Sequence, residues 1–265
     1  MFEIFQFDFM IRAFLAGIAV GAVAPVIGTF LVVRRYSLMA DTLSHVALLG
    51  VALGFLAKIN PLISAAALSI LAAFGLESLR TGRRISGDAA LALFLSGSLA
   101  AAVVIISIAH GFNVSLFSFL FGSISTVSPS DLWLIIGFAF FALLSVFVFY
   151  KELFLVSLDE DLAEASGLKT KFLNIVLTVL AALVVVVSIK VVGALLIGAL
   201  MVIPVLTALQ WKRGFRGTIL LSVLFSLLSA ILGIFFSYYL GWASGGTIVL
   251  LALALFLLSV IFGKK

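Results

Sequence analysis

The chain reads GTFLVVRRYSLMADTLSHVALLGVALG from residue 28 to residue 54, which is two apolar runs joined by a short polar turn. A helix needs about 20 apolar residues to cross roughly 30 Å of hydrocarbon, and both runs reach that length when they are followed outward. The stretch therefore predicts two membrane helices that meet at Arg34 and Arg35. It also places an aspartate and a histidine, Asp41 and His45, within the second helix.

The composition of the whole chain is that of a membrane protein. Of the 265 residues, 65% are hydrophobic and only 10% are charged, whereas soluble domains are about 45–50% apolar. Cysteine is absent, which excludes disulfides and thiolate metal ligands. Basic residues do not cluster with aromatic ones, so nucleic acid is not expected as a partner. We expect a multi-pass protein of the cell membrane, embedded in the lipid bilayer.

Polar residues divide the chain into about nine apolar segments, with eight to ten as the range. This pattern predicts an all-α, polytopic transmembrane bundle that forms a single domain over residues 1–265. The predicted spans are 10–33, 38–57, 61–79, 86–109, 131–150, 172–190, 191–211, 218–240 and 245–262. The segment 112–127 is apolar but short and interrupted by Gly122, so we expect a re-entrant or interfacial segment there.

The basic residues orient these spans, because membrane proteins keep most of their Lys and Arg on the cytoplasmic side. With nine spans, the cation clusters all fall on one side, and only Arg12, Lys58 and Lys190 fall on the other. We therefore expect the N-terminus outside and the C-terminus in the cytoplasm.

Two prolines lie inside predicted spans, Pro25 in the first and Pro204 in the seventh. Proline removes a backbone donor and clashes with the preceding turn, so each helix is expected to bend or break there. Gly17 and Gly21, four residues apart in the first span, favour close helix packing.

Asp41 could be the N-cap of the second helix or lie within it. As the N-cap it would leave a helix of about 16 residues, which is about 24 Å long and shorter than the hydrocarbon layer. Ser37 is the better cap. A helix that starts there has Asp41 one turn inside and His45 two turns inside.

Asp41 and His45 are four residues apart, so a helix places both side chains on one face. A charged residue in a span costs at least about 2.5 kcal/mol and usually faces an interior or a pathway. A carboxylate and an imidazole together suit zinc, manganese or ferrous iron. One chain offers only this pair, whereas a homodimer with these helices at its two-fold axis would offer two of each. The alternative is a hydrogen bond that only ties helices together.

Three other ionisable residues have simpler interpretations. His110, at the predicted outer end of the fourth span, is either solvated or part of a metal entry route. Glu77 and Asp88 flank a basic loop and are expected to be surface charges.

The longest polar stretch is YKELFLVSLDEDLAEASGLKTK, residues 150–171, between the fifth and sixth spans. It predicts a short amphipathic helix near 158–167, because acids at its start favour the helix dipole and Gly167 can end it. The acids are Asp159, Glu160 and Asp161. The apolar side is made of Leu158, Leu162 and Ala165. This helix is either an ordinary solvated connection or a docking element.

The chain has no G-x-x-x-x-G-K-[ST] loop, so it cannot itself bind nucleotide phosphates in that way. The hydrolytic motifs H-E-x-x-H and G-x-S-x-G are also absent, and an enzyme is not expected. Energy for uphill transport would come from an ion gradient or from a partner.

Four stretches resemble, in order and spacing, the membrane permease subunit of the zinc/manganese/iron class of ATP-binding-cassette importers. They are the opening stretch at 28–54, SLDEDLAEASGLK at 157–169, KVVGALLIGALMVIPVLTA at 190–208 and SGGTIVLL at 244–251. The resemblance implies a permease homodimer with two cytoplasmic ATPase subunits and an extracytoplasmic metal-binding protein. It implies no permanently bound cofactor, since the divalent metal ion is the cargo.

Carried over by position, Asp41 and His45 match the family's metal-coordinating pair, and the helix near 159–167 matches its coupling helix, which sits in a groove of the ATPase. Two alternatives stay open. One is a gradient-driven secondary transporter in which the pair relays protons, and the other is a structural or receptor subunit with no pathway.

Overall fold

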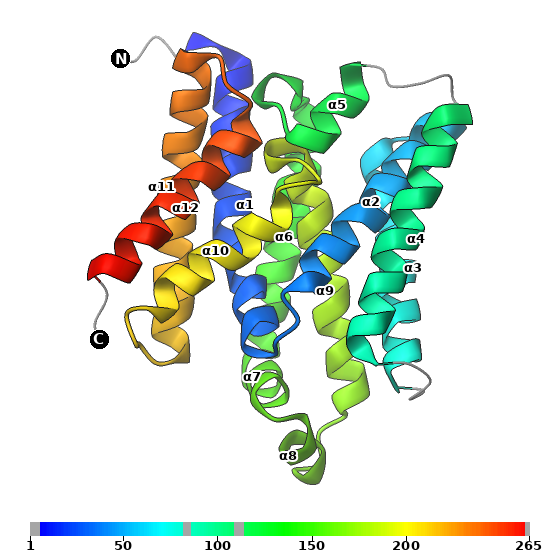
Figure 1. The fold of residues 1–265 in the computed structure, drawn as a ribbon, viewed down its shortest axis with the longest axis vertical. Coiled ribbons are helices and arrows are strands. Elements are labelled where there is room, and N and C mark those ends of the chain that lie inside the picture. The colour runs from blue at the N-terminus through cyan, green and yellow to red at the C-terminus, as the bar shows by residue number, and fades with distance from the viewer. Residues whose placement is uncertain (1–5, 82–85, 109–113, 263–265) are drawn as a thin grey trace.

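The computed structural model describes residues 6–81, 86–108 and 114–262, and these residues form helices and turns with no strand. Figure 1 shows a bundle in which the long helices run alternately in opposite directions. The helices are α1 (Asp8–Val33), α2 (Leu38–Ala57), α3 (Pro61–Thr81), α4 (Gly87–Ile108), α5 (Val114–Phe121), η2 (Ile124–Thr126), α6 (Pro129–Val148), α7 (Tyr150–Leu158), α8 (Glu160–Ala165), α9 (Thr170–Val192), α10 (Ile197–Leu209), α11 (Phe215–Leu240) and α12 (Ser244–Phe262). We name the two ends of the bundle after α5 and α8, which lie at the top and bottom of Figure 1.

Eight of these helices are long and apolar enough to cross a membrane, and α10 is a shorter apolar helix of 13 residues. Together they confirm the prediction of an all-α polytopic bundle of about nine spans. Within 112–127, α5 and η2 have 8 and 3 residues. Eight residues of helix extend only about 12 Å, so this segment does not cross the bilayer.

The centre of the bundle is formed by α1 and α9. In their apolar windows 72% and 78% of the residues are buried, against 22% in α4 and 28% in α6. Glycines bring neighbours close to α1, since a Cβ at Gly17 would collide with Ile234 of α11. A Cβ at Gly28 would likewise collide with the backbone of Met201 in α10.

The predicted boundary between the sixth and seventh spans is a break in the helix at residues 193–196. Gly193, with a φ of 91°, ends α9 in the left-handed region that favours glycine. The Ala194 N–H donates to the Phe119 carbonyl at 2.8 Å, and the Ser123 N–H donates to the Lys190 carbonyl at 3.1 Å. The break is therefore bonded to the C-terminal part of α5.

Three glycines allow three segments to touch by their backbones at the α5 end. They are Gly122 after α5, Gly193 after α9 and Gly245 in the first turn of α12, and we call them the glycine junction. A Cβ at Gly122 would meet the backbone of Val191 and Val192, and one at Gly245 would meet the carbonyls of Val192 and Phe121. No side chain separates these segments at the junction.

Both prolines lie inside continuous helices. α1 continues through Pro25 and α10 through Pro204, so neither proline ends its helix. The Thr29 hydroxyl donates to the Pro25 carbonyl at 2.7 Å. A bend at either proline stays a prediction.

Candidate metal centre and coupling segment

Asp41 lies inside α2, because this helix begins at Leu38, before the aspartate. Ser37 occupies the N-cap position, but its backbone is helical and its side chain makes no capping hydrogen bond. The N-cap interpretation of Asp41 therefore does not hold. His45 follows one turn later on the same face, and both side chains are partly exposed.

Gly198, in the first turn of α10, lies against Asp41. A Cβ at Gly198 would collide with the Asp41 carboxylate. The short helix α10 therefore fixes the position of this carboxylate by close contact. Sequence reasoning missed Gly198, although it lies within the 190–208 stretch that carries the family resemblance.

His45 has an unused ring nitrogen. Its Nδ1 is buried and has no hydrogen-bond partner in the described chain. Such a nitrogen is costly to bury unless a donor or a metal ion satisfies it. No group of three or more His, Cys, Asp or Glu in the described ranges is arranged to hold a metal ion. Asp41 and His45 therefore have no third His, Cys, Asp or Glu beside them in the described ranges, and His110 lies outside the described residues.

Exposed apolar side chains lie at the start of α2 and at both ends of α10. Leu38, three residues before Asp41, is 56% exposed. Leu195 lies just before α10 and Leu209 is its last residue, and both are exposed. Exposed apolar side chains on membrane helices are suited to contact with lipid or with a second protein surface.

The coupling segment forms two short helices, α7 and α8, where the sequence predicted one. Leu158 belongs to the end of α7. The Asp159 side chain accepts a hydrogen bond from the Leu162 N–H at 2.9 Å and so caps α8. Gly167, with a φ of 84°, follows α8 and ends it.

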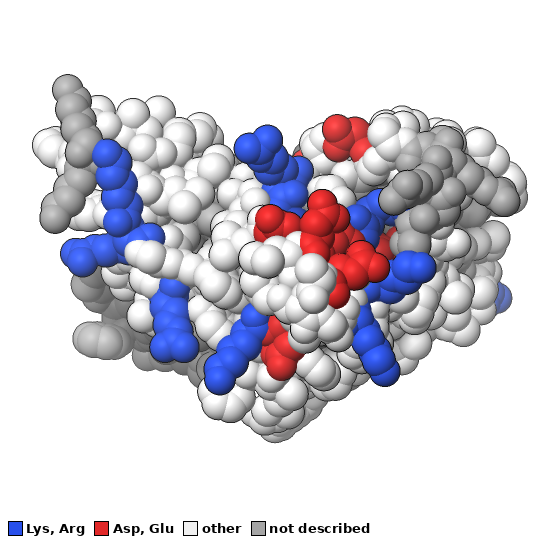
Figure 2. Space-filling view, turned by 90° about the horizontal axis from the view of Figure 1, so that it is seen from below, with Lys and Arg blue, Asp and Glu red and all other residues white. Residues whose placement is uncertain are grey.

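The side chains of α8 divide into an outer and an inner group. Asp161, Leu162 and Ala165 are exposed, and Ala163 is buried. Figure 2 looks onto this end of the molecule and shows acidic atoms gathered near the centre with Lys and Arg around them. The outer side of α8 thus offers acidic and apolar groups together.

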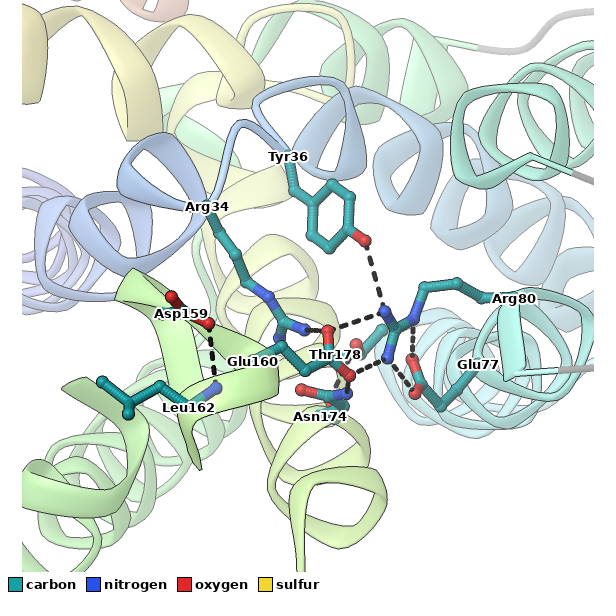
Figure 3. A network of polar contacts seen from close by, with 9 residues as sticks. All are labelled: Arg34, Tyr36, Glu77, Arg80, Asp159, Glu160, Leu162, Asn174 and Thr178. Atoms are coloured by element: carbon teal, nitrogen blue, oxygen red, sulfur yellow. Dashed lines mark hydrogen bonds and ion pairs between the residues drawn. The ribbon is translucent and has the colours of Figure 1, made fainter. Parts of the chain in front are cut away.

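Glu160 belongs to the inner group (Figure 3). Its carboxylate accepts hydrogen bonds from Arg34 at 2.8 Å, from Arg80 at 2.8 and 2.9 Å, and from Asn174 at 2.7 Å. Burial by itself would raise the pKa of Glu160, but the hydrogen bonds from Arg80 and Asn174 and the charge of Arg34 more than offset it and lower the pKa to about 2.

Glu77 corrects one expectation from the sequence. It was predicted to be a surface charge, but it is 6% exposed. Its carboxylate accepts hydrogen bonds from Arg80 at 2.7 and 3.0 Å. Asp88, by contrast, is exposed in the first turn of α4, as predicted. Sequence reasoning counted Arg34 and Arg80 only as cations of the cytoplasmic turns and did not show that both meet the carboxylate of Glu160 on α8.

Comparison with known proteins bears on both sites. The model of the ABC 3 transport family matches residues 6–263. The manganese transport system membrane protein MntC of Listeria monocytogenes is 36% identical over 260 residues, which cover 98% of this chain and 92% of that protein. The high-affinity zinc uptake system membrane protein ZnuB of Haemophilus influenzae is 32% identical, with 96% of this chain and 98% of that protein covered.

A solved structure has the same fold. It is PsaBC from Streptococcus pneumoniae in complex with Fab, with a TM-score of 0.89 and 34% sequence identity. The match covers 99% of this chain and 94% of the compared chain.

Proposed function

The chain belongs to the ABC 3 transport family and is a membrane permease subunit of an ATP-binding-cassette importer for metal ions, and we propose that Asp41 and His45 hold the ion in transit. The observation that carries this proposal is the incomplete pair on α2, with a buried His45 nitrogen that no protein group satisfies. Carboxylate and imidazole suit manganese and zinc, the ions named for the Listeria and Haemophilus relatives.

A second copy of the chain would complete the site. Two protomers that pack the partly exposed side of α2 around a two-fold axis bring together two aspartates and two histidines. Symmetric oligomers are commonly of this kind, with one patch used on both subunits. The metal ion would then cross along the dimer axis, past Asp41 and His45 of both copies.

The remaining parts of the importer are separate chains in this proposal. A cytoplasmic ATPase dimer binds the outer side of α8, and an extracytoplasmic metal-binding protein delivers the ion to the α5 end. The N-terminus is then outside and the C-terminus in the cytoplasm, because the α8 end carries most of the Lys and Arg. The permease itself is not an enzyme.

Replacing His45 with Ala tests the site. In liposomes that contain the permease, its ATPase and its binding protein, uptake of radioactive manganese or zinc should be abolished because a ligand is lost. Ser44→Ala is the matched control. The Ser44 hydroxyl donates only to the Asp41 backbone carbonyl, so uptake should persist in this variant. Full uptake by His45→Ala would refute the site.

The same preparation separates this proposal from gradient-driven transport. The permease alone, under a pH gradient and without ATPase, should take up no metal. Uptake under those conditions would support the secondary transporter instead. Competition between manganese, zinc and ferrous iron in the full complex then identifies the cargo.

A further inference from the structure

Glu160 lies on the helix proposed to meet the ATPase, yet its carboxylate faces the bundle (Figure 3). The helix α8 packs against α7 and α9. In the described chain, Glu160 of α8 forms one ion pair with Arg80 of α3 and another with Arg34, in the turn after α1. The Glu160 side chain therefore connects α8 to α3 and to the turn after α1, although the backbone of α8 does not pack closely on either.

The Arg34 connection leads to the metal-holding helix. Arg34 is the C-cap of α1 and begins the four-residue turn to α2. The turn is held tightly, since the Tyr36 N–H donates to the Leu31 carbonyl at 2.8 Å and the Met39 N–H donates to the Tyr36 carbonyl at 3.0 Å. The Arg34 guanidinium also lies 5.2 Å from the centre of the Tyr36 ring. A displacement of Arg34 therefore moves the first turn of α2, which contains Asp41.

The Arg80 connection leads to α3, which packs along α2. Arg80 donates two hydrogen bonds to Glu160 and two to Glu77. A bidentate arginine–carboxylate pair fixes the relative orientation of the two side chains as well as the distance between them. Through Arg34 and Arg80 together, Glu160 holds the turn before α2 and the neighbouring helix α3.

Removal of the Glu160 charge would loosen this arrangement. Arg34 and Arg80 both point at the Glu160 carboxylate. Without its charge Arg34 loses the ion pair with Glu160, and Arg80 keeps only its pair with Glu77 among the described residues. The side chains of Arg34, Arg80 and Glu160 are 9%, 21% and 32% exposed, so solvent and salt screen their charges less than at an open surface. The contact between α8 and the bundle would therefore weaken.

We infer that Glu160 is a positioning residue that transmits displacement of α8 to α2 and α3 through Arg34 and Arg80, and thereby to Asp41 and His45. The inference rests on the proposed function, because it takes the ATPase as the source of the displacement. It divides α8 into an outer side that binds the ATPase and an inner side that passes the movement on.

The test compares Glu160→Gln with Glu164→Gln, which removes one charge from an exposed position of the same helix. Both complexes should keep their ATPase subunits and basal ATP hydrolysis. In Glu160→Gln the metal transported per ATP hydrolysed should fall at least about five-fold, the lower range of typical coupling between sites. Glu164→Gln should match the unaltered complex. Arg34→Gln combined with Glu160→Gln should be no worse than Glu160→Gln alone, because both act on one contact.

A second measurement does not depend on the cargo. Because the chain has no cysteine, Leu38→Cys places a single thiol at the start of α2, and its rate of labelling by a maleimide reports on that helix. The rate should depend on whether the ATPase holds ATP, and Glu160→Gln should remove this dependence.

The outcomes separate the two proposals. If the unaltered complex transports no metal but its labelling rate depends on ATP and on Glu160, the proposed cargo is wrong and the transmission stands. The inference is overturned if Glu160→Gln keeps the transport ratio and the ATP-dependent labelling. It is also overturned if this variant loses its ATPase, because Glu160 then serves docking.

Discussion

At the scale of the residue, the metal centre depends on the missing side chain of Gly198. In Gly198→Ala the new methyl group would displace the Asp41 carboxylate. We expect metal binding to weaken by about 10–100-fold, as when a group that orients a ligand is changed. Gly137→Ala in α6, where a Cβ has no neighbour within 4 Å, is the control. Isothermal titration of the purified complex checks this, and equal affinity in both variants would contradict it.

Glu160 also predicts how stability depends on pH. Its pKa is lowered in the folded protein from 4.5 to about 2, so its ionised form stabilises the fold. This contribution is complete above about pH 4.5 and is lost as pH falls toward 2. The difference in unfolding temperature between the natural protein and Glu160→Gln should therefore shrink from pH 7 to pH 3. A difference that does not change with pH would show that the network is not ionic in origin.

The sequence was sufficient to identify the candidate residues that share one helix, but not their partners from other helices. Asp41 and His45 are related by helical spacing alone, which can be counted along the chain. Gly198 and the Arg80–Glu160 pair come from helices far apart in sequence, so only the packing of the bundle brings them together. Glu77 and Arg80 pair within α3, three residues apart, but the burial of Glu77 depends on the packing of α3 in the bundle, so Glu77 looked like a surface charge.

At the scale of the element, the outer side of α8 is the proposed binding surface for the ATPase. Leu162 is 54% exposed there. In Leu162→Asp a charge would have to be buried at the contact, which should weaken ATPase binding by at least about 2 kcal/mol, as for a central interface residue. Ser166→Asp adds the same charge just after α8 and should bind normally. Co-purification of the ATPase measures both, and a full complement with Leu162→Asp would count against this surface.

Reversal of all three acids at the start of α8 would be a poor test of docking. Asp159 caps the helix and Glu160 holds the arginines, so their loss would disturb the permease itself. Among these acids, Asp161 is exposed and outside both roles in the described structure. Sequence reasoning predicted the helix and its end at Gly167 from charge and glycine placement, but it could not distinguish which acids face inward.

At the scale of the whole molecule, the incomplete metal site predicts a dimer. In a chain without cysteine, Leu38→Cys near Asp41 should be joined to its counterpart by a short bis-maleimide. Phe140→Cys on α6, at a position that is 66% exposed and outside the proposed interface, should stay monomeric under the same treatment. Gel electrophoresis in the presence of denaturant detects the product. Equal cross-linking at both positions would indicate random collision instead of a defined interface.

The spans were predictable because hydrocarbon thickness sets their length. The one that departs most is the seventh, predicted as 191–211 and observed as a helix from Ile197 to Leu209. Hydropathy continues through Gly193, whereas the helix does not, because the glycine junction forms through contacts between α5, α9 and α12 that no single segment encodes.

The glycine junction has a consequence for how the α5 end of the bundle can move. Backbones in direct contact cannot slide past each other as flexible side chains can, so the C-terminal part of α5, the break after α9 and the start of α12 must pivot as one rigid cap. Because α10 follows this cap along the chain and touches Asp41 through Gly198, any movement of the cap would be passed to the carboxylate of Asp41.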